Sequence, residues 1–198
     1  MPQVRARAAR FTADAVRATA LVSAITVAAT SGDGAAYLGL LFLVLLVPRA
    51  ARLPALLDLV FCAALTWATW SYVGHWYRVA DWYDTVVHSI TPGATAATLH
   101  LLLSKWRLLP APGDPTLRRP AGPLITAALG ATIAAVWEMY EWLATEVAHE
   151  KIPVGYTDTV ADLTAGLSGS LAAGLLLLWC ALRHRPGRRR TTSSSDQM

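Results

Sequence analysis

Long apolar runs separated by short polar segments make up most of this chain. A helix needs about 20 mostly apolar residues to cross the roughly 30 Å hydrocarbon core of a bilayer. Six runs reach or approach that length, so the pattern predicts an all-α, polytopic transmembrane helix bundle with about six spans. The expected spans are residues 14–31, 34–48, 54–74, 83–104, 122–147 and 157–182.

The first two runs fit a full span least well. Residues 34–48 are short, and residues 14–31 contain Arg17. Arginines followed by a short apolar run and small residues also resemble a signal peptide. A cleaved signal is disfavoured because the second apolar run follows at once, with no mature domain between them. A helix lying in the membrane interface is the stronger alternative to a spanning first helix.

The composition agrees with a membrane protein. Hydrophobic residues make up 55% of the chain and charged residues only 15%, whereas soluble domains usually carry about a quarter charged residues. We expect one transmembrane domain over residues 1–182 and a basic, Ser-rich, disordered cytoplasmic tail over residues 183–198. Basic and aromatic residues do not interleave on a soluble face, so no nucleic-acid partner is expected. The expected partner is the lipid bilayer.

The basic residues alternate from loop to loop. With a cytoplasmic N-terminus, fifteen of the seventeen Lys and Arg residues fall in cytoplasmic segments, and only Arg78 and Lys151 fall outside. This distribution obeys the positive-inside rule at every loop. We therefore expect a multi-pass protein of a bacterial-type inner (cell) membrane, with both termini in the cytoplasm.

The same topology places nine of the thirteen acidic residues on the outer side or in the outer half of a span. Acidic residues follow no strong inside–outside rule, so topology alone does not explain this asymmetry. A common site at the outer side would explain it. The nine residues are Asp33, Asp81, Asp84, Glu138, Glu141, Glu146, Glu150, Asp158 and Asp162.

Three pairs within this region have helical spacing, which places both members on one helix face. At about 1.5 Å per residue, the deeper members lie roughly 6–13 Å below the outer ends of their spans. Ionisable groups near the bilayer centre cost at least about 2.5–3.5 kcal/mol, so they normally face a bundle interior and pair there. We expect three helices to bring these groups together. The pairs are Asp84 with His88, Glu138 with Glu141, and Asp158 with Asp162.

A metal site is one interpretation of this cluster. Carboxylates with one imidazole suit Zn²⁺, Mn²⁺ or iron better than copper, and helix bundles build metal sites from inward-facing Glu and His. Asp84 or Asp158 would orient a ligand or act as a general base. The position points to an envelope lipid or a lipid-linked sugar as substrate. The expected metal ligands are His88, Glu138, Glu141 and Asp162.

Two other functions fit the same residues. Intramembrane acids often mark the path of a proton- or cation-coupled transporter, although the inner half of this bundle offers few polar groups. Alternatively, a non-catalytic envelope protein could use the cluster to hold helices together or to bind a lipid headgroup. Whether the protein is an enzyme stays open at this point.

Structural explanations also compete for single residues. Asp84 and Asp158 could be helix N-caps, and Asp58 could pair with Arg49 or Arg52. His100 lies toward the inner end of its span, away from the cluster. Cys62 and Cys180 are expected to be buried apolar residues without a disulfide. An interfacial aromatic belt is expected from Trp82, Tyr83, Trp137, Tyr140 and Trp142.

Three short segments together resemble a known family. They are Trp82–His88 (WYDTVVH), Trp137–Trp142 (WEMYEW) and Asp158–Asp162 (DTVAD), the last followed by Gly166 and Gly169. Their order resembles the YjdF-type inner-membrane proteins and, more distantly, the VanZ-like group associated with the cell envelope. The match covers roughly residues 70–180. It implies the fold and the importance of the three pairs, and it implies no particular reaction.

Overall fold

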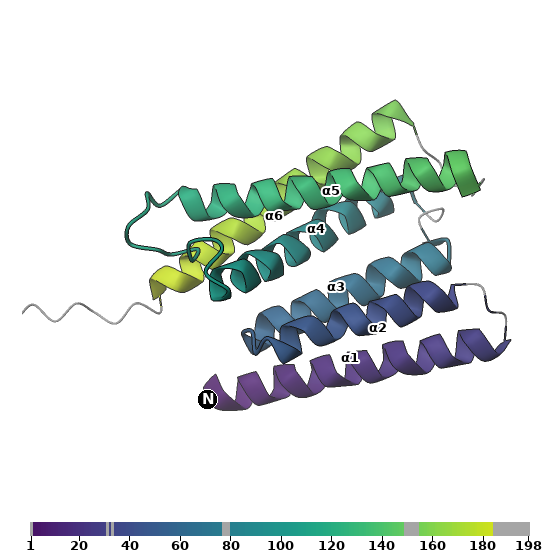
Figure 1. Cartoon of the computed structure of the whole chain (residues 1–198), viewed down its shortest axis with the longest axis horizontal. Coiled ribbons are helices and arrows are strands. Elements are labelled where there is room, and N and C mark those ends of the chain that lie inside the picture. Colours follow the sequence, from purple (N-terminus) through teal and green to yellow (C-terminus); the bar gives the residue numbers. More distant parts are fainter. Residues whose placement is uncertain (1, 31, 33, 77–79, 149–154, 184–198) are drawn as a thin grey trace, which may run out of the picture.

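The computed structural model describes residues 2–30, 32, 34–76, 80–148 and 155–183. These residues form six helices and no strand, as the sequence predicts (Figure 1). Five of them are long and apolar enough to cross a membrane, and α2 is shorter. The helices are α1 Pro2–Thr30, α2 Ala35–Ala50, α3 Ala55–Val73, α4 Asp81–Lys105, α5 Ala121–Ala148 and α6 Tyr156–Arg183.

Some predictions concern residues outside the described ranges. These are the positions of Asp33, Arg78, Glu150 and Lys151, and the disordered tail from residue 184 onward. The side chain of Asp81 is likewise not described, although its backbone begins α4.

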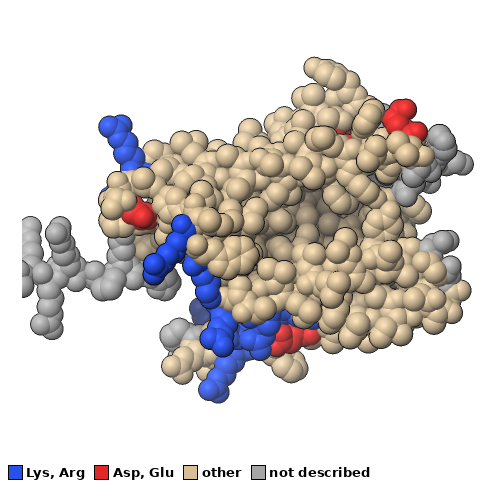
Figure 2. All heavy atoms as spheres, viewed as in Figure 1, with Lys and Arg blue, Asp and Glu red and all other residues tan. Residues whose placement is uncertain are grey.

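Successive helices run in opposite directions and form two groups (Figure 1). Helices α1, α2 and α3 pack together on one side, and α4, α5 and α6 pack together on the other. Contacts between α3 and α4 join the groups, and α6 packs most extensively against α4 and α5. The start of α1 and the end of α6 lie at the same end of the bundle, where Lys and Arg side chains gather (Figure 2).

Small residues let α6 lie very close to α4 and α5. A Cβ added to Gly169 would overlap the backbone carbonyl of Ser89 on α4. A Cβ on Gly166 would lie 2.8 Å from that of Ala134 on α5. Close backbone approach through small residues is a main source of helix association in membranes. This packing fixes the rotation of α6 and therefore the direction in which Asp162 points.

Substituting Gly169 with Ala is expected to destabilise the bundle, because Ser89 contributes backbone that cannot move aside cheaply. Overpacking of this kind typically costs about 1–3 kcal/mol. Gly39→Ala on α2 is the matched control, since nothing lies within 4 Å of an added Cβ there and Ala favours a helix by up to about 1 kcal/mol over Gly. Thermal unfolding in detergent should show a lower melting temperature for Gly169→Ala only. Equal melting temperatures would contradict this account of the α4–α6 contact.

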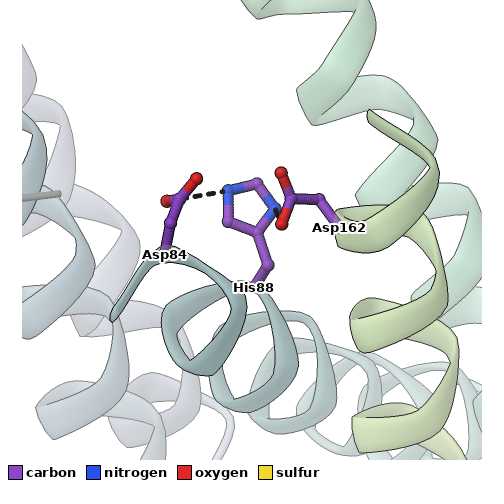
Figure 3. Close-up of side chains that lie close together, drawn as sticks. All are labelled: Asp84, His88 and Asp162. Atoms are coloured by element: carbon purple, nitrogen blue, oxygen red, sulfur yellow. Dashed lines mark ion pairs between the residues drawn. The ribbon is translucent and has the colours of Figure 1, made fainter. Parts of the chain in front are cut away.

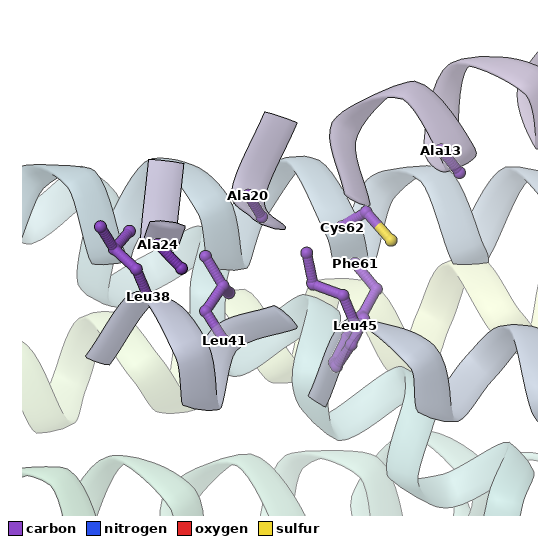
Figure 4. Close-up of a cluster of buried hydrophobic side chains, with 8 residues drawn as sticks. All are labelled: Ala13, Ala20, Ala24, Leu38, Leu41, Leu45, Phe61 and Cys62. Carbon is purple, nitrogen blue, oxygen red and sulfur yellow. The ribbon is translucent and has the colours of Figure 1, made fainter. Parts of the chain in front are cut away.

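Helix α1 begins earlier than the sequence predicts. Its first helical residue is Pro2 rather than Asp14, because the Ala- and Arg-rich segment before Asp14 continues the same helix. The helix packs along α2 and α3 instead of lying apart from them. Figure 4 shows the apolar core that this packing forms, with Ala20 and Ala24 of α1 against Leu38, Leu41 and Leu45 of α2.

Arg17 is buried at the centre of this N-terminal group, with only 5% of its surface exposed. Its Nε donates to the Leu45 carbonyl at 2.8 Å, one guanidinium nitrogen lies 2.9 Å from Asp14 Oδ1, and the other contacts Asp58 Oδ1. The predicted pairing of Asp58 with Arg49 or Arg52 is therefore wrong. The α1–α3 contact brings Arg17 to Asp58, and Arg49 instead lies 3.2 Å from Asp14.

His100 and the two cysteines have structural positions. His100 is fully buried, with Nδ1 2.8 Å from Thr126 Oγ1 and Nε2 3.0 Å from the Pro110 carbonyl. It therefore joins α4 to α5 and to the segment between them, away from the acidic cluster. Cys62 and Cys180 form no disulfide, as predicted, although Cys180 is only half-buried.

Candidate functional site

His88 on α4 lies at the centre of the acidic cluster. Its Nε2 is 3.6 Å from Asp84 Oδ1, one turn earlier on the same helix. Its Nδ1 is 3.6 Å from Glu138 Oε1 on α5 and 3.9 Å from Asp162 Oδ1 on α6. Figure 3 shows the imidazole between Asp84 and Asp162. Three helices thus bring four of the residues singled out from the sequence to one point.

The centre of this cluster is buried, and no Lys or Arg of the described residues pairs with it. The exposed fractions are 8% for His88, 7% for Glu138 and 3% for Asp162. Glu138 Oε1 has no hydrogen-bond partner. Within the described ranges, the ion pairs made by Lys and Arg involve only Asp14 and Asp58, which belong to the N-terminal group of helices. Buried carboxylates without a counter-ion repel one another unless they share a proton or bind a cation.

Glu141 and Asp158 lie at the edge of the cluster. Glu141 Oε1 accepts a hydrogen bond from Trp137 Nε1 at 2.9 Å, four residues earlier on α5. Asp158 is exposed near the start of α6. Both side chains line the same cavity as Asp84 and His88. They are therefore accessible to a ligand in the cavity, whereas the buried carboxylates of Glu138 and Asp162 do not line it.

The N-cap explanation for the two aspartates is wrong. The N-cap of α4 is Ala80, and Asp84 lies inside that helix. Helix α6 begins at Tyr156, so Asp158 belongs to its first turn. Both helices start a little before the predicted positions, which frees these carboxylates from capping the backbone.

The spacing of the candidate ligand atoms suits a metal ion. Two groups of three residues each bring one candidate ligand atom per residue to within 4.8 Å of the other two. The first is Asp84, His88 and Asp162, and the second is His88, Glu138 and Glu141. Two ligands that each lie about 2.1 Å from a tetrahedral zinc ion are about 3.4 Å apart. The separations of 3.6 and 3.9 Å from His88 Nδ1 to Glu138 and Asp162 are close to that value.

A cavity of about 350 Å³ opens beside the cluster, between α2 and α3 on one side and α4 and α5 on the other. Figure 2 shows a hollow between the two groups of helices on this face. Its lining includes Asp84, His88, Glu141 and Asp158, and most of the remaining wall is apolar. Its size falls within the range of about 300–1,000 Å³ found for small-molecule sites.

Three tyrosines connect the two groups of helices beside this cavity. Tyr140 Oη on α5 lies 2.9 Å from Tyr37 Oη on α2 and 3.3 Å from Tyr72 Oη on α3. Tyr37 and Tyr72 also line the cavity. These contacts link α5 to α2 and α3, with which it otherwise has little contact.

The residues of the predicted aromatic belt do not all lie on the outside of the bundle. Trp82 and Trp142 are 67% and 57% exposed, as residues of a membrane interface would be. Tyr83 instead lies inside the bundle, where its Oη accepts from Trp67 Nε1 at 2.6 Å. Tyr140 joins the tyrosine contacts, and Trp137 lines the cavity. Only part of the aromatic set therefore faces outward.

Residues 10–184 match a family model described as "Predicted membrane protein (DUF2238)". The chain belongs to the DUF2238 family. The resemblance to YjdF-type membrane proteins is confirmed, since theirs is this same family. No curated protein and no solved structure matches the chain. The more distant resemblance to the VanZ-like group stays a prediction.

Sequence reasoning missed several residues that shape the site of this DUF2238 protein. Tyr37 begins the second apolar run and Tyr72 ends the third, so both stand at the same end of the bundle as the acids. Two tyrosines at the same end of neighbouring apolar runs could have indicated that this end of the bundle carries polar contacts. No sequence pattern indicated the cavity, because its walls come from five helices.

Proposed function

We propose that this membrane protein binds a divalent metal ion at His88, with Glu138 and Asp162 as further ligands. One observation carries the proposal. Two almost fully buried carboxylates lie 3.6 and 3.9 Å from the same imidazole nitrogen, and Glu138 Oε1 among them has no hydrogen bond. Glu141 belongs with His88 and Glu138 to one group of candidate ligand atoms, whereas Asp162 belongs with His88 and Asp84 to a second. An ion held by His88, Glu138, Glu141 and Asp162 would draw the two groups together at His88.

The remaining acids would support this ion. Asp84 lies 3.6 Å from His88 Nε2, on the far side of the ring from Glu138. A carboxylate there fixes the ring and leaves Nδ1 free for the metal, as in many carboxylate–histidine–metal triads. Asp158 lines the cavity, where it could act as a general base. One imidazole with carboxylates favours Zn²⁺, Mn²⁺ or iron.

Such an ion could activate a water molecule or polarise a bound ester or phosphate. Its place beside a mostly apolar cavity supports an enzyme that acts on an envelope lipid or a lipid-linked compound. A transporter or a non-catalytic envelope protein would need no ion fixed at His88. Metal occupancy therefore separates these functions.

The test is metal analysis of protein purified in detergent without added chelator. We expect about one zinc, manganese or iron ion per chain, removed by a strong chelator and restored by dialysis. Removal should lower the melting temperature, because an ion at 100 times its Kd stabilises the folded state by about 2.7 kcal/mol. Sub-stoichiometric metal after reconstitution with each of the three ions would overturn the proposal.

We also propose that both termini lie in the cytoplasm and that the His88 cluster lies toward the outer face. The gathering of Lys and Arg at the end where α1 begins and α6 ends supports this orientation, since basic residues accumulate on the cytoplasmic side. Bacterial inner membranes are the expected location.

Cysteine labelling tests this orientation. Thr157 near the start of α6 and Thr116 between α4 and α5 are both exposed and lie at opposite ends of the bundle. An impermeant maleimide should label Thr157→Cys in intact inner-membrane spheroplasts and Thr116→Cys only after permeabilisation. Wild type controls for Cys62 and Cys180. The reverse pattern would place the cluster on the cytoplasmic side.

A further inference from the structure

The carboxylates of the cluster form two sets that differ in accessibility. Glu138 and Asp162 are buried and do not line the cavity. Asp84, Glu141 and Asp158 do line it, together with His88. The proposed metal site uses the two buried carboxylates and Glu141, so Asp84 and Asp158 remain at the polar end of the cavity for a second ligand.

We propose that this cavity binds a single-chain amphiphile with a protonated amine headgroup. The hydrocarbon chain would lie between α2 and α3 on one side and α4 and α5 on the other. The amine would lie beside Asp84 and Asp158, at the end of the cavity that Glu141 also lines. This inference goes beyond the metal site and does not require the ion to be present.

The walls of the cavity suit a hydrocarbon chain. Its apolar lining includes Leu40, Leu41 and Val44 of α2, Leu65 of α3 and Ile133 of α5. Leu40 is also 62% exposed, and Figure 2 shows the hollow on the side of the bundle, between the two groups of helices. The cavity therefore opens sideways, on a face that the bilayer would cover. A chain can enter from the membrane without passing through water.

The headgroup must supply the selectivity. Lipid tails are as apolar as leucine side chains, so moving a chain from the bilayer into this cavity gives little hydrophobic gain. Discrimination between membrane lipids then depends on the polar end of the cavity. That end carries three carboxylates, and no described Lys or Arg pairs with them.

The charge of that end favours a cation. The carboxyl groups of Asp84, Glu141 and Asp158 can carry only negative charge or none, so this end of the cavity would repel an anionic headgroup and attract a cationic one. Trp137, Tyr37 and Tyr72 also line the cavity. Aromatic faces attract ammonium groups within about 6 Å. An amine therefore fits both the acids and the aromatic residues.

The proposal can be tested with three photoreactive probes that share one C16 chain with a mid-chain diazirine. One ends in a primary amine, one in a carboxylic acid and one in an alcohol. Each is added to the full-length protein in phosphatidylcholine nanodiscs, and the labelled peptides are identified by mass spectrometry. We expect the amine to label cavity-lining segments of α2, α3 and α5 at least about tenfold more than the acid, which corresponds to about 1.4 kcal/mol.

Matched variants locate the two ends of the ligand. Leu65→Trp on α3 should abolish labelling of the cavity by filling it, whereas Leu56→Trp should not, since Leu56 on the same helix is 69% exposed and lines no part of it. Asp158→Asn should lower amine labelling by about two- to five-fold and leave alcohol labelling unchanged. Retention of full amine labelling in Asp158→Asn and in Asp84→Asn would overturn the headgroup assignment.

The remaining outcomes are also decisive. Equal or stronger labelling by the acid would show that the cavity binds an anionic headgroup through the metal ion, which contradicts an amine ligand. Labelling that Leu65→Trp does not reduce would exclude the cavity. Glu138→Gln separates this inference from the metal proposal, because it should release the ion and still support amine labelling.

Discussion

Replacing Glu138 with Gln is expected to abolish stoichiometric metal binding and, at the same time, to stabilise the metal-free protein. Gln keeps the shape of the side chain but removes a buried charge that lies 3.6 Å from His88 Nδ1 and has no hydrogen bond at Oε1. Loss of a group that merely orients a ligand typically costs 10–100-fold in metal affinity. Loss of a ligand should cost more than about 100-fold.

Loss of metal binding together with a gain in stability of the metal-free protein makes this prediction specific. An acid inside a membrane protein costs roughly 2.5–3.5 kcal/mol near the bilayer centre, so its removal should raise the melting temperature in chelator. Adding Zn²⁺ or Mn²⁺ should then raise the melting temperature of wild type and leave Glu138→Gln unchanged. Metal analysis and thermal unfolding of the same samples measure both effects.

Glu146→Gln is the matched control, because Glu146 is an exposed acid two turns further along α5. It should bind metal as wild type does. If Glu138→Gln lowers stability with and without metal, the cluster holds the helices together and carries no ion. If both variants keep the ion, Glu138 is not a ligand.

The second large effect is expected at Asp58. Asp58→Asn removes the charge that faces the buried Arg17 guanidinium, and Arg17 cannot reach water because only 5% of it is exposed. Breaking one partner of a buried ion pair typically costs about 3–5 kcal/mol. We expect a fall of that size in the free energy of unfolding, measured by denaturant or thermal unfolding in detergent.

Two further variants decide whether the charge pair is the cause. The double replacement Arg17→Met with Asp58→Leu should recover most of the stability, since apolar residues often replace buried ion pairs without loss. Asp14→Ala should cost less than about 1 kcal/mol, because the Asp14 side chain is 44% exposed and exposed pairs contribute little. A double variant as unstable as Asp58→Asn would show that packing, not charge, explains the effect.

The sequence alone predicted the helices well. Apolar run length follows from bilayer thickness, so six helices appear, and the five from Ala35 onward lie close to the expected places. Local helical spacing also placed Asp84 with His88 on one face, because i,i+4 neighbours always meet in a helix. The start of α1 was missed, since the arginines before Asp14 look like a flank although Ala and Arg favour a helix.

Only the tertiary structure decided which helices meet and how each is turned about its axis. The contact of Gly169 with Ser89 sets α6 against α4, and this turns Asp162 toward His88. The α1–α3 contact gives Asp58 its partner in Arg17. The cavity exists because α2 and α3 stand apart from α5 beside the acids. These features depend on the packing of surfaces far apart in the chain, and hydropathy, which measures each run separately, carries no information about them.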